Sequence, residues 1–329
     1  MAGDAIVITA LSWRGGQVAS LREDEIAEAV MQRDSGDCTW VHFQDGGGEK
    51  NALTGLSMVL PPMVQRALTA VETRPRCDSI DGGVLLNLRA PHDDEVLPGE
   101  GDPLVSLRLW AQAGLVLSVS FRASSIVPAV AEQFIAGQLH DPGDVIIALV
   151  VAAAEQLDTT VAAIGDELDD LECNLDHRAS FAERRRTTQL RSQAISLRRF
   201  IVPHSSALER LTSFPIGWID DHERAALREA GDRFARMGEE LESVRERAAV
   251  LHDEITDLRS ERIDARSLQI AIAALIFLPL TFITGLLGMN VEGIPYARAP
   301  WAFWTITAMC TSIALSIAGW FVWRGWSQR

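Results

Sequence analysis

The sequence predicts an α+β domain with a mixed sheet, followed by one long helix and two C-terminal transmembrane helices. Short runs rich in β-branched and apolar residues, bounded by Gly, Pro and Asp clusters, recur through residues 1–122. No proline lies between Asp220 and Pro279, which allows a helix of about 65 residues. Residues 268–287 and 301–323 contain no charged side chain. Each stretch can cross a hydrocarbon layer about 30 Å thick as a helix rising about 1.5 Å per residue.

Residues 1–122 are expected to form the α+β domain. The expected strands are residues 5–11, 39–44, 83–89, 104–111 and 115–121. The three residues that separate the last two strands are few enough for a hairpin. Residues 52–58 and 62–71 look helical, so the domain is expected to be a sheet with helices laid on it.

Residues 123–266 are expected to be helical. The helices expected before the long one are residues 126–138, 142–176 and 181–211. Asp141 offers an N-cap and Pro142 a first-turn proline at the start of the second of them. Pro203 predicts a kink or an interruption in the third.

The long helix carries an apolar seam whose steps alternate between three and four residues. Its members are Leu227, Ala230, Phe234, Met237, Leu241, Val244, Ala248, Leu251, Ile255 and Leu258. No cap or breaker separates Leu258 from Leu268, so one helix is expected to run from the cytosol into the first span. The alternative is a soluble coiled coil that ends before the membrane.

Charges beside the spans predict that both termini lie in the cytosol. The loop between the spans carries only Glu292 and Arg298 as charged residues, whereas arginines precede the first span and follow the second. These arginines are Arg259, Arg262, Arg266, Arg324 and Arg329. Because positive residues stay on the cytoplasmic side, the loop is expected to face out, and the lack of a secretory leader agrees with this.

Composition and spacing argue against several classes of function. A formal net charge of −15 and a pI near 4.9 disfavour nucleic acid as a partner and suit a surface that attracts cations. No HExxH motif and no phosphate-binding glycine loop is present, so neither an enzyme activity nor a cofactor is expected. A structural role is expected for the four cysteines, which lie far apart and form no CxxC pair: Cys38, Cys77, Cys173 and Cys310.

A stripe of mostly small residues follows the first span. Two helices cannot enclose a path for water, so a conducting form of this chain would have to oligomerise. The stripe would let several copies pack closely around an axis, or it packs against the second span. The candidate pore-lining residues are Ser267, Ala271, Ala274, Leu278, Thr281 and Gly285.

Toward the N-terminus of the long helix, carboxylates continue the spacing of the small-residue stripe, in steps of three, four or seven residues. Asp253, Asp257 and Asp264 lie on a different face from the apolar seam. A carboxylate stripe on a central vestibule would raise the local concentration of cations. The ordinary alternative is a solvated outer face.

Residues 281–290, which end in Gly288, Met289 and Asn290, resemble the signature of the CorA superfamily of divalent-cation transporters. The Gly-Ile-Pro at residues 293–295 resembles the ZntB branch of that superfamily. The resemblance covers nearly the whole chain, because further ZntB-like segments follow the same order. These segments are residues 72–76, 168–172 and 197–200 with Pro203.

The resemblance implies a homopentamer with a cytoplasmic funnel domain, stalk helices that become the pore-lining span, and a peripheral second span. Asn290 would place a ring of amide oxygens at the outer mouth, where a cation still holds much of its water. Gly288 would allow close backbone approach there, beside Met289. Glu292 is more typical of the magnesium branch, and five copies would form an acidic collar.

The function implied by the resemblance is transport of Zn²⁺, and of related metals such as Cd²⁺, Ni²⁺ and Co²⁺, across a bacterial inner membrane with proton coupling. The implied partners are further copies of the chain, the bilayer, divalent cations and protons. The alternative is a CorA-type Mg²⁺, Co²⁺ or Ni²⁺ channel gated by cytosolic metal. A two-span tether or signalling protein is the remaining alternative.

Overall fold

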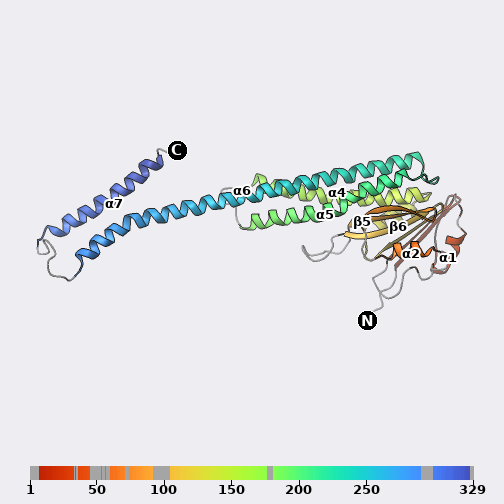
Figure 1. Cartoon of the computed structure of the whole chain (residues 1–329). Coiled ribbons are helices and arrows are strands. Elements are labelled where there is room, and N and C mark those ends of the chain that lie inside the picture. Colours follow the sequence, from red (N-terminus) through yellow and green to blue (C-terminus); the bar gives the residue numbers. More distant parts are fainter. Residues whose placement is uncertain are drawn as a thin grey trace, which may run out of the picture. The chain divides into compact units, whose positions relative to one another are not determined.

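The chain divides into two units (Figure 1). The first unit holds Met1–Asp176 and Ser180–His252, and the second holds His177–Ala179 and Asp253–Arg329. The structure is a computed structural model that describes residues 7–32, 34, 36–44, 53, 56, 60–70, 74–91, 104–175, 181–289 and 299–326.

Seven strands of the first unit form one mixed sheet in the order β2-β1-β3-β7-β6-β5-β4. Neighbouring strands are antiparallel except β3 and β7, which run parallel. The five predicted strands are confirmed, and the structure adds β2 and β4 at the two edges. The strands are β1 Val7–Arg14, β2 Gln17–Ser20, β3 Cys38–Gln44, β4 Arg76–Ile80, β5 Gly83–Pro91, β6 Leu104–Gln112 and β7 Leu115–Ser120.

The predicted hairpin between β6 and β7 is confirmed, with Gln112 opposite Leu115 in the register. Gly114 in its turn has a φ of 75°, a left-handed conformation that glycine adopts without steric cost. A Cβ at this position would also overlap the carbonyl oxygen of Asp34. The Gly114 carbonyl in turn accepts a hydrogen bond of 2.9 Å from the N–H of Thr39, which starts the parallel pairing of β3 with β7.

The helices of both units follow the predicted order, with one addition near the N-terminus. They are α1 Glu23–Met31, α2 Pro62–Leu68, α3 Ile126–Ile135, α4 Pro142–Cys173, α5 Phe181–Ser213, α6 Asp221–Leu287 and α7 Ala302–Trp326. The predicted cap of α4 is confirmed, because the Asp141 side chain accepts a hydrogen bond of 2.9 Å from the N–H of Asp144. The helix expected at residues 52–58 lies outside the described residues except for Leu53 and Leu56.

Helix α5 continues through Pro203, so of the kink or interruption expected there, the interruption is wrong and the kink stays a prediction. Proline removes one helical N–H and usually weakens the turn before it. The neighbouring residues Ile201 and His204 are buried, and tertiary packing of this kind supplies most of the stability of a helix in a protein.

Helices cover both faces of the sheet (Figure 1). Helices α1 and α2 pack on one face, whereas α3, α4 and α5 contact the strands from the other. Side chains alternate across β3, so Val41 and Phe43 join the core beneath α1 and α2. Trp40 points the other way, where its ring lies 6.3 Å from that of Phe134 in α3. The sheet is therefore buried on both sides, as the uniform burial of β3, β6 and β7 also indicates.

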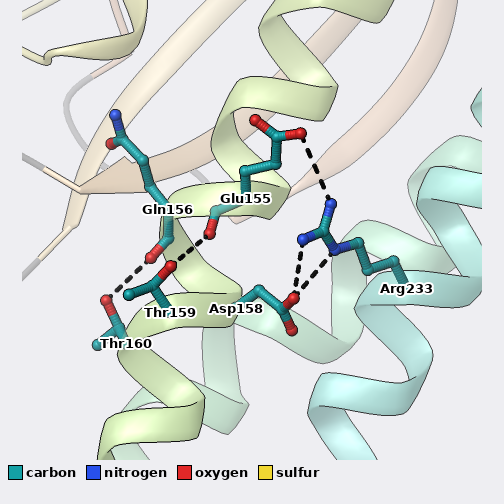
Figure 2. Close-up of polar contacts among 6 residues, drawn as sticks. All are labelled: Glu155, Gln156, Asp158, Thr159, Thr160 and Arg233. Atoms are coloured by element: carbon teal, nitrogen blue, oxygen red, sulfur yellow. Dashed lines mark hydrogen bonds and ion pairs between the residues drawn. The ribbon is translucent and has the colours of Figure 1, made fainter.

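The apolar seam of α6 is buried within the first unit from Leu227 to Leu251. Ion pairs flank the seam: Arg233 reaches Asp158 of α4 at 2.8 Å, and Figure 2 shows Glu155 of α4 approaching the same guanidinium. Such part-exposed pairs contribute up to about 1 kcal/mol each, whereas a buried Leu or Phe contributes about 1.5–3 kcal/mol. The seam thus holds α6 in place, and the charges set its register.

Two histidines of the first unit are buried in the neutral form. Burial lowers the pKa of His42 to about 4, and its Nδ1 lies 2.8 Å from the hydroxyl of Ser118. Burial likewise lowers the pKa of His204 to about 4, against a partly compensating set of backbone hydrogen bonds. The His204 Nε2 accepts a hydrogen bond of 2.9 Å from the N–H of Arg89, and its ring stacks on Phe234 at 4.4 Å.

We expect the contribution of His42 and His204 to the free energy of unfolding to fall as the pH drops below 6.5. The unfolded chain takes up protons at His42 and His204 from about pH 6.5, whereas the folded chain does so only near pH 4. Each histidine therefore removes up to about 3 kcal/mol across this interval, and its contribution is complete above pH 6.5. Chemical unfolding of the full chain in detergent at pH 8 to 5 measures this slope.

Substitution of His204 by Gln should flatten the slope, because one titrating group is lost. Substitution of the exposed His222 by Gln is the matched control and should leave it unchanged. An identical slope in all three proteins would contradict the assignment.

Candidate functional site

The apolar end of α6 is not buried by any part of the chain that the structure describes. An 18-residue window of this helix has a mean hydropathy of 2.5, and none of it is buried. All six candidate pore-lining residues are exposed, and Leu278 among them is 75% exposed. The Thr281 hydroxyl donates a hydrogen bond of 2.8 Å to the Phe277 carbonyl, which leaves its oxygen lone pairs directed away from the helix backbone.

Helix α7 has the same character. Its residues 302–321 have a mean hydropathy of 1.5 in the most apolar window, of which 6% is buried. Phe303, Trp304, Leu315 and Trp323 are exposed. Aromatic side chains of this kind gather at both ends of α7, as is typical where a helix meets the two surfaces of a membrane.

A third helix, α4, is also long and apolar enough to cross a membrane by length and composition. Its most apolar window is 44% buried, and α4 contacts the sheet through β3, β5 and β7. Its apolar side chains are therefore explained by packing in the first unit. The two predicted spans, in α6 and α7, remain the helices whose apolar surface has no cover among the described residues.

The residues of the expected mouth lie at the end of α6, which stops at Leu287. The N–H of Gly288 donates a hydrogen bond of 2.9 Å to the Thr284 carbonyl, and a Cβ at residue 288 would crowd that oxygen. Met289 is exposed. Asn290 and Glu292 lie outside the described residues, so their expected place at a mouth stays a prediction.

The carboxylates of the expected vestibule share one face of α6. Asp253, Asp257 and Asp264 are exposed, whereas Leu251 and Ile255 of the seam, which alternate with them, are buried. The separation of the acidic face from the seam is therefore confirmed. The structure brings these carboxylates into line along the helix with the stripe of small residues, because steps of four and seven residues stay on one face.

A group of carboxylates that the sequence did not point to lies in the first unit. One oxygen each from Asp141, Asp144 and Glu223 come within 4.8 Å of one another. Burial and the nearby charge of Asp141, against a hydrogen bond from the backbone of Asp220, raise the pKa of Glu223 to about 7. In the sequence these residues look like ordinary helix caps, and nothing there indicates that two capping segments 80 residues apart meet.

Together, a mixed sheet, a helix that runs from the first unit into an apolar stretch with no buried residue, and a second apolar helix fit a membrane protein whose transmembrane segments lie in α6 and α7. A profile of the family described as "CorA-like Mg2+ transporter protein" matches residues 35–324. The chain belongs to this family.

The names of similar proteins refer to zinc in one case and to divalent cations in general in another. The zinc transport protein ZntB of Yersinia enterocolitica is 28% identical over 98% of this chain and 96% of its own length. The divalent cation transporter CmaX of Pseudomonas aeruginosa is 31% identical over 87% of this chain and 86% of its own.

Solved structures resemble the whole chain as well. The structure of full-length CmaX matches with a TM-score of 0.78 and 29% identity, over 98% of this chain and 99% of that one. The CorA magnesium transporter of Methanocaldococcus jannaschii has the same TM-score at 16% identity, over 96% of this chain and 98% of that one, which indicates a shared fold.

We expect an arginine in the uncovered part of α6 to impair membrane insertion. Substitution of Phe277, which is 67% exposed, by Arg places a charge near the centre of the span at a cost of about 2.5–3.5 kcal/mol. The measurement is the fraction of chain that resists alkaline extraction from membranes. The same substitution at the exposed Thr159 of α4 is the control and should extract like the parent, and equal extraction of both variants would contradict the assignment of α6 as a span.

Proposed function

We propose that the chain is a homopentameric transporter of divalent cations in a bacterial inner membrane, with both termini in the cytosol. The observation that carries this proposal is the stripe on α6, whose small and hydroxyl-bearing residues are exposed on a single chain. Several copies that place this stripe on a common axis would line a path for an ion, which two helices alone could not enclose. Membership of the CorA-like family supports the proposal.

The same proposal assigns each segment of the chain to the cytosol or to the membrane. Residues 1–122 and 123–266 form the cytoplasmic part, and residues 267–329 the membrane part. Gly288, Met289 and Asn290 form the outer mouth, where amide oxygens meet a hydrated ion, and Glu292 attracts cations to it.

Zn²⁺ is the proposed cargo, together with related transition metals such as Cd²⁺, Ni²⁺ and Co²⁺, and proton coupling is part of the proposal. Similarity to proteins named for zinc transport over 98% of the chain supports zinc. The proposed path offers oxygen rather than the nitrogen and sulfur ligands that hold zinc tightly. Weak oxygen contacts suit passage, because an ion that is bound tightly leaves slowly.

A CorA-type Mg²⁺, Co²⁺ or Ni²⁺ channel gated by cytosolic metal is the second candidate. The description of the matching family names Mg²⁺, and Glu292 places a carboxylate beside the mouth sequence. Hard cations such as Mg²⁺ prefer this oxygen chemistry.

We expect purified protein in liposomes to pass Zn²⁺, and we expect substitution of Asn290 by Ala to reduce the flux by at least about tenfold. The loss of one hydrogen-bonding group per subunit, at about 1 kcal/mol each, is enough for an effect of this size. Metal-sensitive dyes inside the vesicles measure the flux, with Mg²⁺ as the competing cargo. Native mass spectrometry should show five copies in parent and variant alike.

Passage of Mg²⁺ without Zn²⁺ would favour the channel. The absence of any metal movement under metal and proton gradients would remove both functions. An unchanged flux in the Asn290 variant would contradict the assignment of Asn290 to the pore mouth.

Substitution of Asp253, Asp257 and Asp264 together by Asn should slow cation flux most at low ionic strength. Salt of 0.1 M screens charges beyond about 10 Å, so the attraction exerted by an acidic vestibule fades as salt is added. Flux measured from 10 mM to 300 mM salt tests this. A variant with Asp221, Glu229 and Asp232 neutralised is the control for net charge. Equal flux of the vestibule variant and the parent at every ionic strength would place the three carboxylates on an outer face.

A further inference from the structure

The starts of α4 and α6 meet in the first unit, and each brings carboxylates. Asp141 precedes α4 and Asp144 lies in its first turn, while Glu223 lies in the first turn of α6. One oxygen from each residue lies within 4.8 Å of the other two. This group is distinct from the proposed pore residues, all of which belong to the second unit.

Helix capping accounts for part of this arrangement. The Asp144 carboxylate accepts a hydrogen bond of 2.9 Å from the N–H of His140, while Asp144 donates its own N–H to Asp141. At the start of α6, Asp220 and Glu223 form a reciprocal pair of 2.5 and 2.7 Å between backbone N–H groups and side-chain oxygens. One oxygen of each capping carboxylate is thereby satisfied.

Capping does not account for the second oxygen of Glu223. Glu223 is only 5% exposed, and its buried Oε1 has no hydrogen-bond partner among the residues that the structure describes. A buried carboxylate oxygen with no partner is costly, so such atoms in a native protein normally have a ligand or an ion. Gly143 permits the position, because a Cβ at residue 143 would overlap the Glu223 carboxylate.

The local charge favours a cation of charge two. Each helix N-terminus contributes roughly half a positive charge, so two of them leave roughly two negative charges on three carboxylates. The other charged group acting on Glu223 is Asp220, which is also negative, and the Nδ1 of the part-exposed His140 lies 3.6 Å from the Asp144 carboxylate. The dipoles of the two helices alone therefore do not neutralise the group.

We propose that Asp141, Asp144 and Glu223 bind a hard divalent cation, of the Mg²⁺, Mn²⁺ or Ca²⁺ class, within a single chain. A set made only of carboxylate oxygens is typical of these ions and not of zinc. A spacing of up to 4.8 Å matches ligands on opposite sides of an ion with bonds of about 2.3–2.6 Å, and small side-chain rotations bring it to the shorter bonds of Mg²⁺. The bound ion ties the first turn of α6 to that of α4, whichever cargo crosses the membrane.

Mn²⁺ titration of the full-length chain in detergent, after removal of metal with a chelator, tests this site. Electron paramagnetic resonance counts bound Mn²⁺, and the melting temperature is recorded with and without the ion. Substitution of Glu223 by Gln keeps the capping oxygen and adds an amide donor toward Asp141. We expect this variant to lose one Mn²⁺ per chain, or to bind it at least about tenfold more weakly, and to melt no lower than the parent when metal is absent.

Asp221→Asn is the matched control, because Asp221 is the exposed residue in the same helical turn. It changes the charge by the same amount and should bind Mn²⁺ like the parent. Asp144→Asn is a second ligand variant, which keeps the test decisive if the Glu223 variant folds poorly, and it too should lose the same Mn²⁺. Ions held in the membrane part remain in every variant, so a transport defect and the loss of this site are separate results.

Equal Mn²⁺ binding in the parent, Glu223→Gln and Asp144→Asn would overturn the proposal. A parent chain whose melting temperature does not respond to Mn²⁺, Mg²⁺ or Ca²⁺ would overturn it as well. In that event Glu223 is a cap that shares a proton with Asp141.

Discussion

The structure depends on one constraint, which is that the apolar surface of α6 has to be covered along its 67 residues. Helices α4 and α5 and the seam of α6 bury each other, so the constraint is met within the first unit as far as Leu251. Further along the helix, none of its most apolar 18-residue window is buried. The apolar length that remains is suited to hydrocarbon and, under the proposed function, to contact with other copies of the chain. The first part of α6 thus carries charged residues together with its apolar seam, whereas its last part is apolar throughout and suits a membrane.

The sheet of the first unit is buried on both faces, and several of its buried polar groups have partners. Arg108 is 1% exposed and lies over the ring of Phe121 at 4.3 Å, and burial together with the charge of Arg89 lowers its pKa to about 10. Trp40 donates a hydrogen bond of 3.0 Å to Ser118, whose hydroxyl also meets His42. Polar networks that are satisfied in this way favour one arrangement over its neighbours. A platform of this kind holds the start of α6 in a defined position.

The long helices and the central strands could be predicted because their signals are local. The seam of α6 and the uncharged spans can be read along the chain, and so can the Asp141 cap. Edge strands such as Gln17–Ser20 were not predicted, because a strand of four mostly exposed residues contains no run of apolar residues. The meeting of Glu223 with Asp141 could not be predicted, since it depends on how α4 and α6 pack. For the expected mouth, the family signature identifies the residues in the sequence but says nothing of the positions of their side chains.

The passage of α6 through Pro279 has a consequence for the mechanics of the span. Proline has no N–H to offer the carbonyl one turn earlier, at Leu275, so one rung of the hydrogen-bond ladder is missing inside the most apolar part of the helix. A missing rung lowers the cost of bending at that point relative to the turns on either side. Helix α6 is therefore expected to bend more readily at Pro279, about two and a half turns before Gly288, than along the part that precedes its apolar stretch. Motion of the helix, whatever starts it, will be concentrated there.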